Sequence, residues 1–350
     1  MTPMACPPSP AAPVVRSETV WHAAWVRFQR DRVGLVSLAV VALFLLLILA
    51  SACGWVAGQW QQEVGVPNAP PTWLGPRPPE ALPTDTEPRG PNVDLSDVDP
   101  LAPRYAEWAE RAKRYRSTEP VRAETLPLGG DRMGRDVLSK ALKGTEISVF
   151  VGVLAAVLAT GIGTVLGALA GFFGRWVDDA LEWLYNVFTA VPDILMIFAF
   201  AAVFGRGLTT VVVILGLVGW TGLYRQVRAE FMKHRSREYV RAAEAIGASS
   251  AARMFRHILP NVSHVILVRM SLMVVGFIKS EVILSYLGLG VPIDQVSWGT
   301  MLAEAQSELI LGHWWQLATA TVFMATFVTA FSLMADAWRD ALDPQLKGQA

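Results

Sequence analysis

Long runs without a charged residue constrain the fold of this chain more than any other feature. A helix needs about 20 mostly apolar residues to cross the hydrocarbon core of a bilayer, and the first such run covers residues 33–56. A signal peptide has an apolar core of only about 7–15 residues, so we expect a retained anchor, with a signal peptide as the alternative. Further predominantly apolar runs cover residues 147–174, 183–204, 208–224, 265–289 and 314–338. The sequence predicts an all-α membrane protein with six transmembrane helices.

The composition supports a membrane protein. Hydrophobic residues make up 53% of the 350 positions and charged residues 17%, whereas soluble domains carry about 25% charged residues. The 30 Lys and Arg residues balance the 30 Asp and Glu residues, so no broad field for nucleic acid is expected. The two cysteines, Cys6 and Cys53, form neither a disulfide framework nor a metal-ligand spacing. We therefore predict no metal site and no cofactor.

The distribution of basic residues predicts the orientation in the membrane. Arginines cluster in residues 1–32 and basic residues in the stretch 225–262, whereas the loop 290–313 contains no Lys or Arg. Cytoplasmic loops carry an excess of Lys and Arg, so both termini and the stretch 225–262 are expected in the cytoplasm. Residues 57–143 then lie outside.

The outer segment, residues 57–143, holds thirteen of the 22 prolines. Because proline at this density prevents regular helices and central strands, we expect an irregular proline-rich extracytoplasmic insert, or a disordered linker in its first half. A short amphipathic helix is expected where aromatic and small residues recur at helical spacing, namely at Tyr105, Trp108, Ala112 and Tyr115.

Three glycines repeat at every fourth position in the second apolar run. Gly163, Gly167 and Gly171 lie on one helix face, and small residues at this spacing let a neighbouring helix approach closely in lipid. The alternative is a span that is merely rich in glycine and flexible.

The cytoplasmic stretch 225–262 predicts two short helices with a break between them. Gly247 suits the left-handed position after a helix end, Ser249 can cap the next helix, and Pro260 is expected to stop it. Small alanines beside basic residues favour insertion into the groove of a partner. An ordinary basic loop that meets anionic lipid is the alternative.

The order of residues in this stretch resembles a known motif. Ala242-Ala243, Gly247 four residues later and Leu259-Pro260 twelve residues after that resemble the EAA motif of ABC-importer membrane subunits. The likeness is strongest to the peptide/nickel permease family, and to its second permease subunit type with a C-terminal Leu-Asp-Pro tail. Further segments similar to the family's motifs are residues 128–139, 285–290, 297–302 and 338–344.

The resemblance implies a fold, a set of partners and a location. The fold is the type-I ABC-importer permease fold in a bacterial cytoplasmic (inner) membrane, and the chain forms half of a translocation pathway for peptides. The implied partners are a second homologous permease subunit, two ABC ATPase subunits and an extracytoplasmic substrate-binding protein. The implied division of the chain is a cytoplasmic tail (1–32), a first span (33–56), the insert (57–143), a five-helix core (144–340) with its coupling segment (225–262), and a C-terminal tail (341–350).

In that family the EAA helices dock into the cleft of the ATPase. The resemblance therefore implies ATPase-coupling roles for Glu238, Arg241, Ala242, Ala243, Gly247, Leu259 and Pro260. The chain departs from the wider motif at Arg241, where glutamate is usual, and Glu238 lies one turn earlier. Which of these two side chains pairs with the ATPase stays open.

The chain contains no Gly-Lys dipeptide and therefore no Walker A phosphate cradle. We predict a transport subunit that is not an enzyme, with ATP hydrolysis in a partner. A secondary carrier, or an ABC permease for nickel or another small solute, is the alternative function.

Isolated charges in the apolar runs are candidates for the translocation pathway. Ionisable groups in a bilayer usually face the bundle interior or water. Asp193 follows Pro192 in the third run, and Glu281 lies deep in the fifth; we expect both to line the pathway, with an interior ion pair as the alternative for Glu281. Arg269 can reach the membrane interface by snorkelling.

Overall fold

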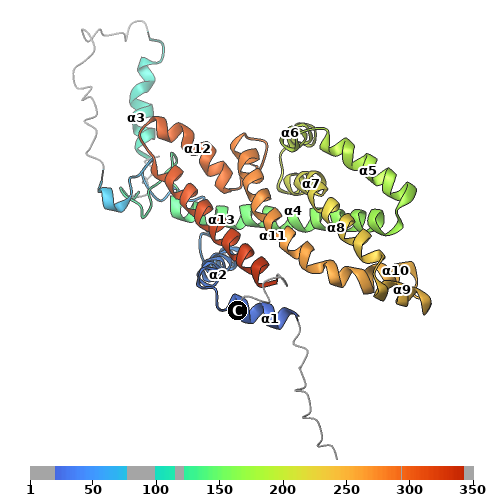
Figure 1. Ribbon diagram of the computed structural model, residues 1–350. Coiled ribbons are helices and arrows are strands. Elements are labelled where there is room, and N and C mark those ends of the chain that lie inside the picture. Colours follow the sequence, from blue (N-terminus) through green and yellow to red (C-terminus); the bar gives the residue numbers. More distant parts are fainter. Residues whose placement is uncertain (1–19, 77–98, 115–121, 293, 343–350) are drawn as a thin grey trace, which may run out of the picture. The chain divides into compact units, whose positions relative to one another are not determined.

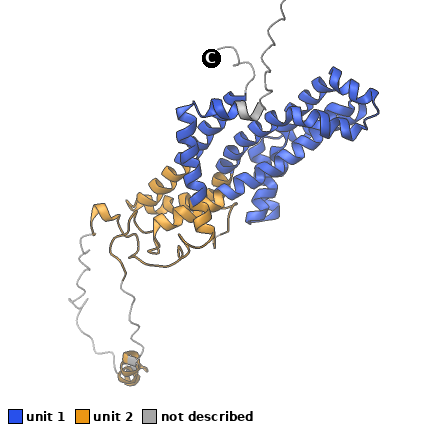
Figure 2. Cartoon of the chain, turned by 90° about the horizontal axis from the view of Figure 1, so that it is seen from below, with its two compact units in different colours: residues 1–46, 149–280, 325–350 blue, residues 47–148, 281–324 orange. Residues whose placement is uncertain are grey.

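The computed structural model describes residues 20–76, 99–114, 122–292 and 294–342 (Figure 1). The chain divides into two compact units, which Figure 2 colours separately. Unit 1 comprises Met1–Leu46, Val149–Ser280 and Ala325–Ala350, and unit 2 comprises Leu47–Ser148 and Glu281–Met324. The regular elements of the described residues are helical, which confirms the all-α prediction.

Four helical stretches among the described residues are long and apolar enough to cross a membrane. They are α2 (Arg32–Ala52), α4 (Val137–Phe173), the stretch Ser250–Tyr286 that ends in α11 (Leu259–Tyr286), and α13 (Trp315–Leu342). Two bent helix pairs also pass this test, so the described part of the chain contains up to six candidate spans by length and composition if each bent pair is one span. The prediction of a multi-span helical membrane protein is confirmed.

The two bent pairs lie in unit 1. Helices α5 (Arg175–Thr189) and α6 (Asp193–Phe204) meet at 83°, and α7 (Leu208–Gly219) and α8 (Thr221–Arg235) meet at 42°. Pro192 is the N-cap of α6. Proline cannot donate a backbone hydrogen bond and disfavours helical geometry in the residue before it. The third predicted run is therefore broken into two helices at this proline.

Close packing of α4 on α8 uses the predicted glycine face. A Cβ added to Gly163 would lie 2.8 Å from the carbonyl oxygen of Trp220, and one added to Gly167 would lie 2.7 Å from that of Tyr224. Real side chains do not approach a backbone so closely, so only glycine permits this separation. The prediction that these glycines admit a neighbouring helix is confirmed.

Unit 1 also fixes α5 against α8 and the short helix α1 (Val20–Phe28) against α13. The Arg228 guanidinium donates to both carboxylate oxygens of Asp178, at 2.6 and 2.9 Å. The Phe28 ring lies edge-on to Trp338 with centroids 5.3 Å apart, and Arg27 Nη1 donates to the Ala341 carbonyl oxygen at 3.1 Å. These contacts anchor both ends of the described chain within unit 1.

Unit 2 contains the described part of the proline-rich segment. The regular elements of this described segment are the short 3-10 helices Thr72–Leu74 and Ala102–Arg104 and helix α3 (Tyr105–Arg114). Helix α3 confirms the predicted short helix at its described positions, and Tyr115 lies outside the described residues. Isolated β-bridges join this segment to the residues that precede α4, for example Glu63 to Arg135.

Helix starts in unit 2 are defined by side-chain caps. Asp136 accepts hydrogen bonds from the backbone N–H and the hydroxyl of Ser139, at 3.0 and 2.6 Å, at the start of α4. Ser297 and Thr300 form a capping box at the start of α12 (Trp298–Ile310). Such caps satisfy N–H groups that have no partner within the helix. The segments that resembled family motifs thus contain the residues that begin two helices.

Candidate functional site

The predicted coupling segment, residues 225–262, lies in unit 1 and runs from within α8 to the first turn of α11. Helix α9 (Glu238–Ala245) is followed by Gly247, whose φ is +86°. The Ser249 hydroxyl accepts the backbone N–H of Ala252 at 3.2 Å and caps the short helix α10 (Ser250–Ala252). Both local predictions, a left-handed glycine and a serine cap, are confirmed.

The coupling segment presents an exposed face with apolar side chains. Arg241 and Ala242 are exposed, whereas Ala243 is 4% exposed and packs inward. Ile246 is 85% exposed and Phe255 54% exposed. Glu238 and Pro260 are also exposed, and Leu259 is half-buried. An exposed isoleucine beside small residues and an arginine can contact a partner without rearrangement of its own helix.

Arg253 connects the two short helices of this segment. Its Nη1 lies 2.6 Å from Glu244 Oε1, and its guanidinium carbon lies 5.4 Å from the centroid of the Phe172 ring. The Arg253 side chain is only 16% exposed. Planar guanidinium groups favour both kinds of contact. Arg253 therefore holds α9 and α10 in a fixed relation on the end of α4.

Pro260 does not stop the helix that precedes it, so this prediction is wrong. The segment Arg253–Ile258 is π-helical, and α11 begins at Leu259 and continues through Pro260 to Tyr286. Proline is tolerated in the first turn of an α-helix, where its missing N–H has no intrahelical partner. The change from π- to α-helix places Pro260 at such a position.

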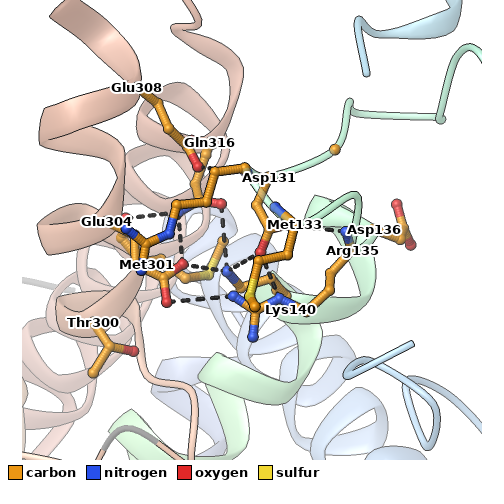
Figure 3. Close-up of polar contacts among 12 residues, drawn as sticks. Asp131, Met133, Arg135, Asp136, Lys140, Thr300, Met301, Glu304, Glu308 and Gln316 are labelled. Carbon is orange, nitrogen blue, oxygen red and sulfur yellow. Dashed lines mark hydrogen bonds and ion pairs between the residues drawn. The ribbon is translucent and has the colours of Figure 1, made fainter. Parts of the chain in front are cut away.

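A buried charge network lies in unit 2, where α4 begins (Figure 3). Asp131 is fully buried, and its Oδ1 accepts the backbone N–H groups of Met133 and Arg135, both at 2.9 Å. Its Oδ2 accepts Arg135 Nε at 2.7 Å and Lys140 Nζ at 2.8 Å. Burial alone raises the pKa of the Asp131 carboxyl, but the Lys140 and Arg135 charges and hydrogen bonds hold the pKa below its usual value.

Lys140 joins α4 to α12 and α13. Its ammonium group is fully buried and also pairs with Glu304 of α12. Gln316 of α13 donates Nε2 to Glu304 Oε2 at 3.1 Å and to the Met301 carbonyl oxygen at 3.1 Å. The network thus pairs two cations, Lys140 and Arg135, with two carboxylates, and it ties together three helices of unit 2.

Glu308 lies beside this network with one oxygen unused. Its Oε1 accepts the backbone N–H of Arg132 at 2.9 Å, whereas Oε2 has no hydrogen-bond partner among the described residues. Burial raises the pKa of the Glu308 carboxyl to about 7, and the charges of Asp131 and Glu304 act in the same direction. The charge of the Glu308 carboxyl therefore changes near neutral pH.

Glu281 is enclosed by serines. Its carboxylate is fully buried and accepts the Ser148 hydroxyl at 2.8 Å and the Ser285 hydroxyl at 2.6 Å. The Ser148 oxygen in turn accepts the backbone N–H of Trp298 at 3.2 Å. In this conformation the carboxylate of Glu281 does not face open space, and its role in the pathway stays a prediction. No ion pair of Glu281 is found among the described residues.

Asp193 lies at the first turn of α6 and is exposed. A carboxylate there interacts favourably with the positive end of the helix dipole. The predicted site residues thus lie in three places. The predicted coupling residues and Asp193 occupy different helices of unit 1, and Glu281 lies in unit 2.

Sequence reasoning missed Arg253, Lys140 and Glu304 as site residues. Asp131 lies within the motif-like segment 128–139, but the motif does not predict its pairing with Lys140. A charged residue in the first turn of a helix that continues into a charge-free apolar run was the available signal for Lys140. Nothing in the sequence connects Lys140 with Glu304, which lies 164 residues away.

Long apolar helices with an exposed helical segment between two of them define this chain as a multi-pass membrane protein. A family model described as "binding-protein-dependent transport system inner membrane component" matches residues 163–348. This range covers more than half of the chain and includes the coupling segment. The chain belongs to this family, and its resemblance to the membrane subunits of ABC importers is confirmed.

Individual relatives agree with the family. The chain is 36% identical to the oligopeptide transport system permease protein OppC of Bacillus subtilis over 238 residues, which cover 67% of this chain and 78% of the relative. It is 36% identical to the dipeptide permease DppC of the same organism, over 63% of this chain and 68% of the relative. It is also 36% identical to the glutathione permease GsiD of Pectobacterium atrosepticum, over 63% and 73%.

Proposed function

We propose that this chain is a membrane permease subunit of an ATP-driven peptide importer. Membership of the inner-membrane-component family carries this proposal. Peptides are the proposed cargo because relatives of similar identity are named oligopeptide and dipeptide permeases. These matches do not favour the alternative of a secondary carrier.

The proposed assembly contains partners that supply energy and cargo. Two ABC ATPase subunits hydrolyse ATP, an extracytoplasmic binding protein delivers the peptide, and a second homologous permease completes the pathway. Both termini lie in the cytoplasm. The excess of basic residues in 225–262 supports this orientation, because cytoplasmic loops carry an excess of Lys and Arg. The proposed division of the chain is tail, first span, outer insert, core and C-terminal tail, at residues 1–32, 33–56, 57–143, 144–340 and 341–350.

Coupling to the ATPase is proposed to use the exposed face of the coupling segment. The exposed Arg241 and Ala242 and the apolar Ile246 offer a surface of the kind that a helix needs in a partner's groove. The buried Ala243, the left-handed Gly247, Leu259 and Pro260 shape the segment. Arg253 acts as a positioning residue that keeps this surface in place. Glu238 shares the contact with Arg241 at the start of α9.

Co-purification with peptide uptake tests the proposal. A tagged copy of the chain, purified in mild detergent, is expected to retain a protein with a P-loop ATPase sequence. Proteoliposomes that contain the assembly, with the binding protein outside, are expected to accumulate a radiolabelled peptide only when ATP is supplied to the ATPase. Uptake of Ni²⁺ without peptide uptake would replace the proposed cargo, and uptake without any ATPase would refute the importer assignment.

Ile246→Asp tests the docking face within this assembly. A charge at this exposed apolar position is expected to release the ATPase while the permease still enters the membrane. Ser236→Asp is the matched control, because Ser236 is exposed in the turn before α9 and does not belong to the proposed face. Equal ATPase retention by both variants would show that Ile246 lies outside the contact.

Asp193 and Glu281 are proposed to line the pathway in a conformation that differs from the present one. Contact of Glu281 with cargo requires the serines around it to separate, because the carboxylate is fully buried here. Glu281→Gln is expected to change uptake kinetics with little loss of assembled complex. Glu281→Cys, made after removal of the exposed Cys53, is expected to react with an impermeant thiol reagent during transport. Absence of labelling in every transport state would exclude Glu281 from the pathway.

A further inference from the structure

A basic cavity in unit 1 is not used by the proposed coupling surface. The cavity has a volume of 430 Å³ and lies between α8, α11 and α13. Its polar lining comes from Gln226, His264, Arg269 and Arg339, and its apolar lining includes Val268 and Leu272. The cavity therefore combines hydrogen-bond donors with hydrocarbon walls.

The charge of the cavity selects an anion. Arg269 and Arg339 carry two positive charges, and none of the described residues that line the cavity is Asp or Glu. The Arg269 Nε is buried and has no hydrogen-bond partner among the described residues. A buried donor without a partner is unfavourable, so the protein's own groups do not fully satisfy the Arg269 guanidinium.

The Arg269 guanidinium lies close against the neighbouring helix α8. A Cβ added to Gly222 of α8 would lie only 2.8 Å from Arg269 Nη2, so the guanidinium rests on a place where α8 has no side chain. Arg339 lies in the last turn of α13, and Gln226 lies on α8. Donors from three helices thus reach one space.

The depth of the cavity favours a lipid as the source of the anion. Arg339 lies three residues before the end of the span α13, whereas Val268 and Leu272 lie within the span that contains α11. A ligand here meets charged groups at the end of a span and apolar side chains within one. Phospholipids have a phosphate next to hydrocarbon, and basic pockets between membrane helices bind anionic headgroups.

We propose that this cavity binds the phosphate headgroup of an anionic phospholipid, with the Arg269 and Arg339 guanidinium groups as its donors and with Val268 and Leu272 against the start of the acyl chain. Free phosphate shares the headgroup's chemistry but lacks the hydrocarbon that these apolar residues would contact. The proposal concerns a site apart from transport coupling, so its test uses lipid binding rather than uptake.

The test measures phospholipid retained by the purified, assembled transporter. Native mass spectrometry compares complexes taken from nanodiscs of phosphatidylglycerol with complexes taken from nanodiscs of phosphatidylcholine. Wild type is expected to retain phosphatidylglycerol preferentially, and Arg269→Gln and Arg339→Gln are each expected to weaken this binding about tenfold or more, because each removes a charge-assisted hydrogen bond. Arg225→Gln is the matched control, because Arg225 is exposed on α8 and does not line the cavity.

A second variant keeps the test decisive if an arginine variant fails to assemble. Leu272→Phe retains both positive charges but narrows the apolar part, so it is expected to reduce phosphatidylglycerol retention while the complex stays intact. The proposal would be overturned if wild type and the cavity variants retained phosphatidylglycerol equally. It would also be overturned if wild type retained phosphatidylcholine as well as it retains phosphatidylglycerol. Displacement of the lipid by inorganic phosphate or by a cargo peptide at millimolar concentration would overturn the assignment to lipid and identify that anion as the occupant.

Discussion

Replacement of Lys140 by methionine tests the buried charge network of unit 2. The change keeps the length of the side chain and removes its positive charge. Asp131 then loses a partner at 2.8 Å, and Glu304 loses its contact with the same ammonium group. Because both Lys140 and Asp131 are fully buried, water cannot replace the lost charge. We expect the variant to enter the membrane but to unfold at a lower temperature.

The magnitude follows from the distances. Opposite unit charges 2.8 Å apart attract by about 6 kcal/mol at an effective dielectric constant of about 20, and desolvation of both groups offsets part of this attraction. Loss of one partner from a buried pair costs about 3–5 kcal/mol. Asp131 still has Arg135 Nε at 2.7 Å, and Glu304 still has Arg135 Nη2 at 3.5 Å. The expected loss in the free energy of unfolding therefore lies near the lower end of this range, at about 3 kcal/mol.

The assay is the fraction of monodisperse protein that remains after heating, followed by fluorescence-detected gel filtration. Lys143→Met is the matched control, because Lys143 lies on the same helix and pairs with Glu146 at 2.8 Å while 26% exposed; partly exposed pairs contribute about 0–1 kcal/mol. The double variant Lys140→Met, Asp131→Asn is expected to be less harmful than the sum of its two single changes. Equal melting of Lys140→Met and Lys143→Met, or strict additivity, would refute the reasoning.

Three further predictions concern glycines and pH. Gly247→Val is expected to abolish ATP-driven uptake at normal protein level, because β-branched residues are strained at a φ of +86°; Gly276→Val, where an added Cβ meets nothing within 4 Å, is the control, and normal uptake by Gly247→Val would contradict the prediction. Gly167→Leu is expected to reduce the yield of folded protein strongly, whereas Gly161→Leu, with open space at its Cβ, is not; similar yields would contradict the packing of α4 on α8. The folded-state pKa of Glu308 is raised from 4.5 to about 7. The contribution of the neutral Glu308 carboxyl to the free energy of unfolding is therefore fully present below the unfolded pKa and is lost as the pH rises through about 7. Thermal midpoints of Glu308→Gln relative to wild type are therefore expected to rise between pH 5 and pH 8, and a pH-independent difference would contradict this.

Local features of the fold were predictable from the sequence where a short-range physical rule applies. The spacing of Gly163, Gly167 and Gly171 identified a close helix contact, although not its partner α8. Gly247 and Ser249 identified a helix end and a helix start, because each has a conformational or hydrogen-bonding preference of its own. The apolar runs identified the membrane spans by length alone.

Features that depend on distant residues were not predictable. Pro260 continues in a helix because the preceding turn is π-helical, and proline by itself gives no sign of that. Lys140 is stabilised by Asp131 and Glu304, of which the second lies far away in the sequence. The enclosure of the Glu281 carboxylate requires a hydrogen bond from Ser148, which lies on another helix. Periodicity and composition describe one element at a time, so contacts between elements are outside their reach.

Cross-linking of the coupling segment to its partner tests the central claim most directly. In a chain without Cys6 and Cys53, Ala242→Cys is placed on the exposed face of α9, and the assembled membrane fraction is treated with a short bifunctional thiol reagent. The account predicts one adduct that contains a P-loop ATPase, formed from position 242 but not from Leu217→Cys, an exposed position in α7. If the ATPase is present in the assembly and position 242 gives no adduct with it, while position 217 does, this segment is not the coupling surface.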